Sequence, residues 1–128
     1  RFADGLLGFP DVRDFVLVPA ERAGTYWLQS AEHTSLAFLV IDPFLHFPDY
    51  VVELADTEVQ GLEAGERADV AILAIVTLPA ADGEPATANL QGPLALNLRH
   101  GRGRQVILRD GSLGVRRSFR LDEAPACA

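Results

Sequence analysis

Apolar residues occur along this chain in short runs, and within several runs apolar and polar positions alternate. Runs of this kind bounded by Gly, Pro, Asp and Asn are typical of β-strands, because successive side chains of a strand point to opposite faces. The pattern predicts strands at 14–19, 25–30, 35–42, 49–54, 69–78, 94–99, 104–108 and 114–121.

Two of these runs also indicate which face is buried. In 94–99, Leu94, Leu96 and Leu98 share one face, and Ala95, Asn97 and Arg99 share the other. In 114–121, the apolar face holds Val115, Phe119 and Leu121, with Arg117 as an exception among them. We therefore expect both strands to be half-buried.

Only the segment 56–66 has a helical pattern. Asp56 can cap its start, Gly65 can end it, and Val59 and Leu62, three positions apart, can supply a buried stripe. Eight strands with one short helix near 56–66 predict a mainly all-β fold, a small β-barrel or sandwich-like single domain over 1–128.

Composition supports one folded domain. The chain has 128 residues, 48% of them hydrophobic, and a net charge of -7, so it can form a core and is not a disordered segment. A single cysteine, Cys127, allows no intramolecular disulfide, and the longest apolar run, 70–79, is about half of the ~20 residues that span a bilayer. With no secretion signal recognisable at the N-terminus, we expect a cytoplasmic protein without membrane segments.

The sequence contains no recognisable catalytic or metal-binding motif. His33, His46 and His100 lie too far apart for a local ligand set, and we expect no metal, cofactor or catalytic residue. Ser30, Glu32 and His33 lie close together, but without an oxyanion-hole pattern they are better explained as a polar turn. Likewise, the glycines of 101–104 predict a hairpin turn between strands.

Charge is distributed unevenly along the chain. Ten acidic residues lie between 42 and 84: Asp42, Asp49, Glu53, Asp56, Glu58, Glu63, Glu66, Asp69, Asp82 and Glu84. Seven arginines follow between 99 and 120: Arg99, Arg102, Arg104, Arg109, Arg116, Arg117 and Arg120. The arginines lack interleaved aromatic residues and the overall pI is about 4.8, so direct nucleic-acid binding is disfavoured, and the acidic stretch is suited to a basic protein partner.

The segment 42–50 offers the best candidates for a protein interface. Phe44, Phe47 and Tyr50 lie among prolines and next to the acidic stretch, an arrangement typical of interface centres. The same aromatic residues could instead close one end of the core, and both interpretations remain open here.

Further candidate contacts are acidic or polar. They are Glu53, Asp56, Glu58 and Glu63, to which we add Asn89. Asn89, Asn97 and Gln105 can also satisfy backbone groups at strand ends, which is the more common role of such residues.

Five blocks of the sequence, in order, resemble the flagellar assembly factor FliW family. They are FADGLLGFPDVRDFVLVP (2–19), YWLQSAEHTSLAFLVIDPFLHFPDYVVEL (26–54), VAILAIVT (70–77), TANLQGPLALNLRHGRGRQVIL (87–108) and GVRRSF (114–119). The resemblance implies a mostly β, non-enzymatic bacterial protein that binds the translational regulator CsrA, relieves its repression of flagellin messenger RNA without occupying the RNA site, and also binds flagellin in a partner switch.

Two other functions are kept as alternatives. A small split-barrel enzyme or ligand-binding protein could hold a flavin in the barrel mouth. RNA binding through Arg99 to Arg117 is ranked last because the net charge opposes it. No heptad pattern or long exposed apolar strand is present, so we expect a monomer when the protein is free.

Overall fold

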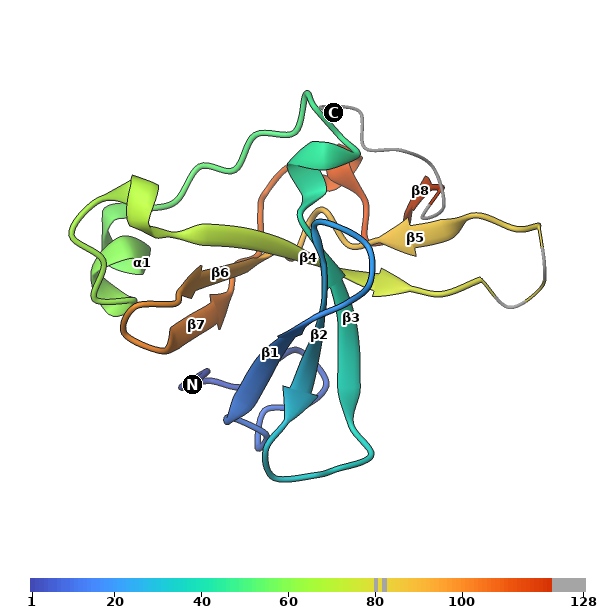
Figure 1. Ribbon diagram of the computed structural model, residues 1–128. Coiled ribbons are helices and arrows are strands. Elements are labelled where there is room, and N and C mark those ends of the chain that lie inside the picture. Colours follow the sequence, from blue (N-terminus) through green and yellow to red (C-terminus); the bar gives the residue numbers. More distant parts are fainter. Residues whose placement is uncertain (80, 82, 121–128) are drawn as a thin grey trace.

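A computed structural model describes residues 1–79, 81 and 83–120, which form a curled antiparallel sheet (Figure 1). The strands are β1 (Phe15–Pro19), β2 (Thr25–Ser30), β3 (Ala37–Ile41), β4 (Ala71–Thr77), β5 (Ala86–Ala88), β6 (Leu94–Asn97), β7 (Arg102–Gln105) and β8 (Arg117–Phe119). The helices are α1 (Asp56–Gly61) and three 3₁₀ turns, η1 (Pro43–Leu45), η2 (Arg67–Asp69) and η3 (Gly111–Leu113). The predicted mainly β fold with one short helix is confirmed.

Strand β4 is the common element of the sheet. Its first half pairs with β6, and its second half pairs with β3 and with β5. Ala88 pairs with Val76 of β4, and Leu94 pairs with Leu73 of the same strand. Six positions of chain therefore lie opposite three positions of β4, so residues 89–93 form a bulge between β5 and β6. Figure 1 shows the result: β6 and β7 lie beside one end of β4, and β5 and β8 lie beside the other.

The core consists of three apolar clusters. One is built on Leu39, Ile41, Ala74 and Val76 and is covered by the chain after β3. A second joins Leu28, Val40, Leu73, Leu94 and Leu96 to the N-terminal residues Phe2 and Leu6. The third packs Leu54, Val59 and Leu62 against Ala95 and Val106. Both faces of the sheet are therefore covered over much of its area.

The N-terminal segment bridges β1 and β7. Phe2 pairs with Gly103, the N–H of Gly103 donates to the carbonyl of Arg1 at 2.9 Å, and the N–H of Phe2 donates to Arg13 at 2.8 Å. A Cβ on Gly103 would lie 2.7 Å from both Leu96 Cδ2 and Phe2 Cζ. A side chain at 103 would therefore displace Phe2 or Leu96, because both pack directly against this backbone.

Seven of the predicted strands coincide with or overlap observed strands, and one prediction is wrong. Residues 49–54 form no strand, although Val52 and Leu54 turn inward while Val51 and Glu53 face solvent. The alternation is that of a strand, but no neighbouring strand pairs with it. Strand β5 was not predicted, because its three residues are too few to show a periodic pattern.

The helix begins and ends differently from the prediction. Asp56 is its first residue and not its cap; Ala55 precedes it, and the Glu58 carboxylate accepts a hydrogen bond from the Ala55 N–H at 2.9 Å. The helix ends at Gly61, not near 65, because Glu63 adopts a left-handed φ of 58°.

The predicted burial of two strands also needs correction. Both faces of β6 are buried, with Leu94 and Ala95 at 0% exposure and Asn97 at 2%, because α1 and the preceding segment cover the second face. Leu98 lies in the following turn and is 62% exposed. At the C-terminus Phe119 is buried as predicted, Val115 is 59% exposed because β8 starts only at Arg117, and Leu121 lies outside the described residues.

Candidate protein-interaction surface

The aromatic segment 42–50 folds back over the sheet. The Asp42 carboxylate accepts the Phe44 N–H at 3.0 Å and so starts the η1 turn, with Pro43 at its first position. Phe44 and Phe47 are half-buried, and Phe47 packs edge-on to Phe119 of β8 at 5.9 Å between ring centroids. Both rings keep part of their surface accessible to a partner.

Tyr50 lies in the core. It is 7% exposed, its ring lies 5.7 Å from that of Phe44, and its hydroxyl donates to the carbonyl of Leu90. Burial raises the pKa of Tyr50 to about 12. This position matches the interpretation in which aromatic residues close the core, so Tyr50 offers little surface to a partner in this conformation.

Three of the candidate acidic residues are engaged within the chain. Asp56 pairs with Arg67 at 2.5 Å and Glu63 pairs with Arg102 at 3.2 Å, both on exposed side chains. Glu58 accepts from the N–H that precedes α1. Exposed ion pairs of this kind contribute little to stability, but they neutralise part of the acidic stretch.

Two further acidic residues of the stretch line a groove. This groove has a volume of about 730 Å³ and is formed by residues 49–58 and 106–113, two segments that are far apart in the sequence. Glu53 lines it, as does Asp49, and neither side chain has a hydrogen bond or an ion pair with the rest of the described chain. The groove therefore presents two unpaired carboxylates of the acidic stretch, Asp49 and Glu53, along one wall.

Sequence reasoning missed two apolar residues of this groove. Val51 is 67% exposed and Ile107 is 56% exposed, and both line it. The predicted strands 49–54 and 104–108 assigned both residues to paired strands. In each segment the residue lies between two inward-facing neighbours, and this position could have indicated that Val51 and Ile107 are exposed. Only the fold shows that both residues lie along one groove.

Asn89 and Gln105 hold backbone groups around the 89–93 bulge. Asn89 Oδ1 accepts from the Gly92 N–H at 2.8 Å, and Gln105 Nε2 donates to the Gly92 carbonyl at 2.9 Å. Asn97 does the same elsewhere, donating to the buried Leu62 carbonyl at 3.0 Å. The backbone-satisfying role considered for these three residues is confirmed, while any contact of Asn89 with a partner remains a prediction.

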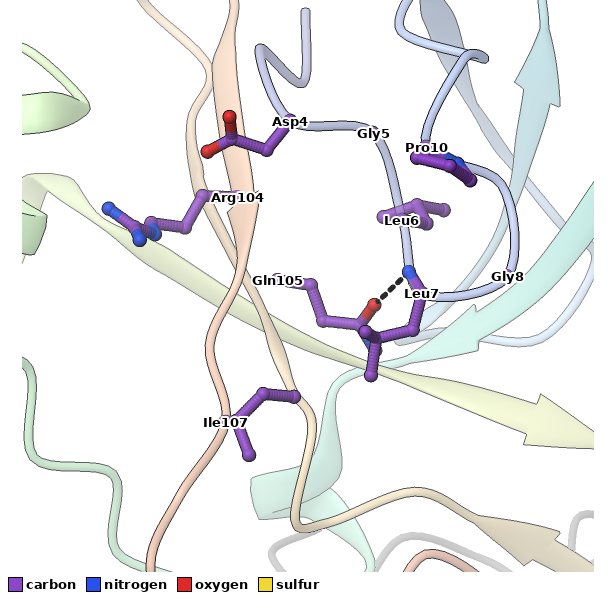
Figure 2. A pocket seen from close by; sticks show the side chains of 9 residues that line it. All are labelled: Asp4, Gly5, Leu6, Leu7, Gly8, Pro10, Arg104, Gln105 and Ile107. Carbon is purple, nitrogen blue, oxygen red and sulfur yellow. Dashed lines mark hydrogen bonds between the residues drawn. The ribbon is translucent and has the colours of Figure 1, made fainter.

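A pocket of about 360 Å³ lies between the N-terminal loop and β7 (Figure 2). Gln105 Oε1 accepts the Leu7 N–H at 2.9 Å across it, which ties this loop to the strand. Gly5 turns the loop with a φ of 66°, and a Cβ there would lie 2.5 Å from the Phe9 carbonyl oxygen. Both the oxygen and the nitrogen of the Gln105 side-chain amide are thus bonded to backbone groups of the fold.

The arginine-rich stretch is divided between two regions. Arg99, Arg102 and Arg104 belong to the β6–β7 hairpin, whereas Arg116, Arg117 and Arg120 lie on or beside β8, at the other end of β4 in Figure 1. Arg117 lies 6.0 Å from the centre of the Phe47 ring, and Arg120 donates to the Gly83 carbonyl at 3.0 Å. The sequence run does not correspond to one continuous basic strip. A hairpin turn joins the two strands, but it lies at 98–101 and not at the predicted 101–104, because Arg102 to Arg104 are already paired in β7.

Ser30 and His33 form a turn. The Ser30 hydroxyl accepts the N–H groups of Glu32 and His33 at 3.1 and 2.9 Å, which is the polar turn that we predicted. Within the described part of the chain, no group of three or more His, Cys, Asp or Glu side chains is arranged to hold a metal ion. No helix in that same part is both long and apolar enough to cross a membrane.

Comparison with known proteins connects these features with a family. The model of the FliW protein family matches residues 1–119. The flagellar assembly factor FliW of Treponema denticola is 41% identical over 111 residues, 87% of this chain and 75% of that protein. That of Geobacillus kaustophilus is 41% identical over 108 residues, 84% of this chain and 74% of that protein.

The fold agrees as well. A solved crystal structure of the flagellar assembly factor FliW matches with a TM-score of 0.80 at 36% identity, covering 94% of this chain and 83% of that chain. These relatives are named as assembly factors and not as enzymes. The resemblance seen in the sequence is confirmed by family, relatives and structure, and the chain belongs to the FliW family of flagellar assembly factors.

Proposed function

We propose that this protein acts in flagellar assembly by binding CsrA in the cytoplasm and relieving its repression of flagellin messenger RNA. In the same proposal, flagellin binds the protein in turn and releases CsrA. The protein acts by binding and not by catalysis. The observation that carries this proposal is the family match over residues 1–119.

The surface of the molecule supports a basic protein partner. The net charge is -7, and the unpaired carboxylates Asp49 and Glu53 lie beside exposed apolar residues in one groove. An RNA-binding regulator has a basic surface of its own, and opposite charges increase the rate at which two proteins associate. Apolar side chains surrounded by charge supply the affinity at such interfaces.

An RNA release assay tests this function. CsrA from the same organism is bound to the leader of its flagellin messenger RNA, and increasing amounts of this protein are added. We expect free RNA to appear as a complex of the two proteins forms, and we expect added flagellin to reverse the effect. A CsrA–RNA complex that stays intact at saturating protein would contradict the proposal.

A further inference from the structure

Residues 51–54 alternate between outward and inward positions as a strand does, without the hydrogen bonds of one. Val52 and Leu54 pack inward while Val51 and Glu53 face solvent. In the portion of the chain that the structure describes, the N–H groups of 51–54 and the carbonyls of 51–53 have no protein partner. Backbone groups of this kind are bound by water or are available to another chain.

The second wall of the groove has the same property. The N–H groups of Val106 and Leu108 donate to Pro93 and Gln91, at 2.9 and 2.8 Å. Ile107 lies between them, faces outward, and its own N–H and carbonyl make no hydrogen bond with the described residues. Two extended segments with unpaired peptide groups therefore line one groove of about 730 Å³.

The apolar and charged side chains that line the groove indicate which residues a bound peptide would carry. The exposed surfaces of Val51 and Ile107 suit apolar residues at alternate positions of an extended peptide. The charged groups that line the groove are Asp49, Glu53, Glu58, Asp110 and Arg109. Four acids against one arginine favour a peptide that carries Lys or Arg.

We propose that this groove binds an extended, basic segment of CsrA by strand addition. Main-chain hydrogen bonds to alternate residues of 51–54 and to Ile107 hold the segment. Its apolar residues contact Val51 and Ile107, and its basic residues pair with Asp49 and Glu53. The inference rests on the proposed function, which supplies the partner, and the excess of acidic groups in the groove suits the basic surface of an RNA-binding protein.

Matched pairs of variants test the groove. Glu53→Lys reverses a groove charge, and Glu21→Lys makes the same change at an exposed residue that does not line the groove. Val51→Asp removes an apolar contact, and Val115→Asp makes the same change at a valine of similar exposure outside the groove. Calorimetric titration with CsrA should show at least about tenfold weaker binding for each groove variant and less than about twofold for each control.

The possible outcomes separate this inference from the proposed function. If the wild-type protein does not bind CsrA, the proposed function fails. If it binds and the groove variants bind equally well, only the groove assignment fails. If the groove variants lose flagellin binding and keep CsrA binding, the occupant named here is wrong. Self-association of the wild-type protein that Val51→Asp abolishes would also contradict it, since the occupant would be a second copy.

Hydrogen exchange tests strand addition itself. The amides of 51–54 and of Ile107 should exchange rapidly in the free protein, because none has a hydrogen-bond partner in the described structure. An added strand pairs with alternate residues of an edge, so we expect Ile107 and either Val51 and Glu53 or Val52 and Leu54 to be protected when CsrA is bound. Protection confined to other segments, with these amides still exchanging rapidly, would overturn the proposed binding mode.

Discussion

Individual polar and aromatic residues illustrate what a sequence can and cannot assign. Asn97 and Gln105 were predicted to satisfy backbone groups, and they do so because short amides near strand ends lie close to unpaired peptide groups. Tyr50 could not be assigned, since an aromatic residue beside Pro48 and Asp49 suits both an interface and a core. Only the path of the 42–50 segment over the sheet decided that it is buried.

Replacing Tyr50 with phenylalanine tests that burial. The Leu90 carbonyl, in a residue 2% exposed, would lose its hydrogen bond from the Tyr50 hydroxyl. We expect Tyr50→Phe to lower the free energy of unfolding by about 1–3 kcal/mol at pH 7, measured by urea denaturation. A variant as stable as the wild type would show that the hydroxyl is not needed there.

Tyr50 also predicts a dependence on pH. The pKa of Tyr50 is raised from 10.0 to about 12 in the folded state. Between pH 10 and pH 12 the hydroxyl of Tyr50 therefore loses its proton more readily in the unfolded chain than in the folded one. The stability that the wild type gains from the protonated hydroxyl is therefore full below pH 10 and is lost as pH rises toward 12. The difference in stability between wild type and Tyr50→Phe should shrink over this range, and a constant difference would contradict the assignment.

Elements were predicted well where each strand has a partner. The runs that form β1, β3 and β4 are short and almost continuously apolar, and the sheet pairs all of them. The 49–54 run alternates between inward and outward positions but has no pairing, because a side-chain pattern reports which residues are buried and not whether a neighbouring strand exists. The start of α1 was also misassigned, since Glu58 supplies the cap from inside the helix.

The docking of α1 on the β6–β7 hairpin is a testable packing interaction. Leu62 is 1% exposed, and its carbonyl accepts a hydrogen bond from Asn97. We expect Leu62→Ala to lower the free energy of unfolding by about 2–5 kcal/mol through lost burial and a cavity. Leu98→Ala, at a residue 62% exposed, is the matched control and should change stability by less than about 0.5 kcal/mol. Equal effects of the two variants in chemical denaturation would contradict the packing described.

At the scale of the whole molecule, the sequence indicated the family and the acidic character but not the surface. Order and spacing of the five blocks were sufficient for the family, because they extend over most of the chain. The groove was not predictable, since it is formed by residues 49–58 and 106–113, which only the curled sheet brings together. Its unpaired carboxylates, Asp49 and Glu53, belong to the first segment, and its exposed apolar residues, Val51 and Ile107, belong one to each.

The central claim is that this molecule binds CsrA through an acidic surface. Calorimetric titration with the CsrA of its own organism, at about 50 and about 300 mM salt, tests it most directly, because salt screens exposed charges beyond a few ångströms. We predict saturable binding at both concentrations, with weaker affinity at the higher one. The absence of saturable binding at low salt would contradict the account, and affinity independent of salt would contradict the role given to the acidic groove.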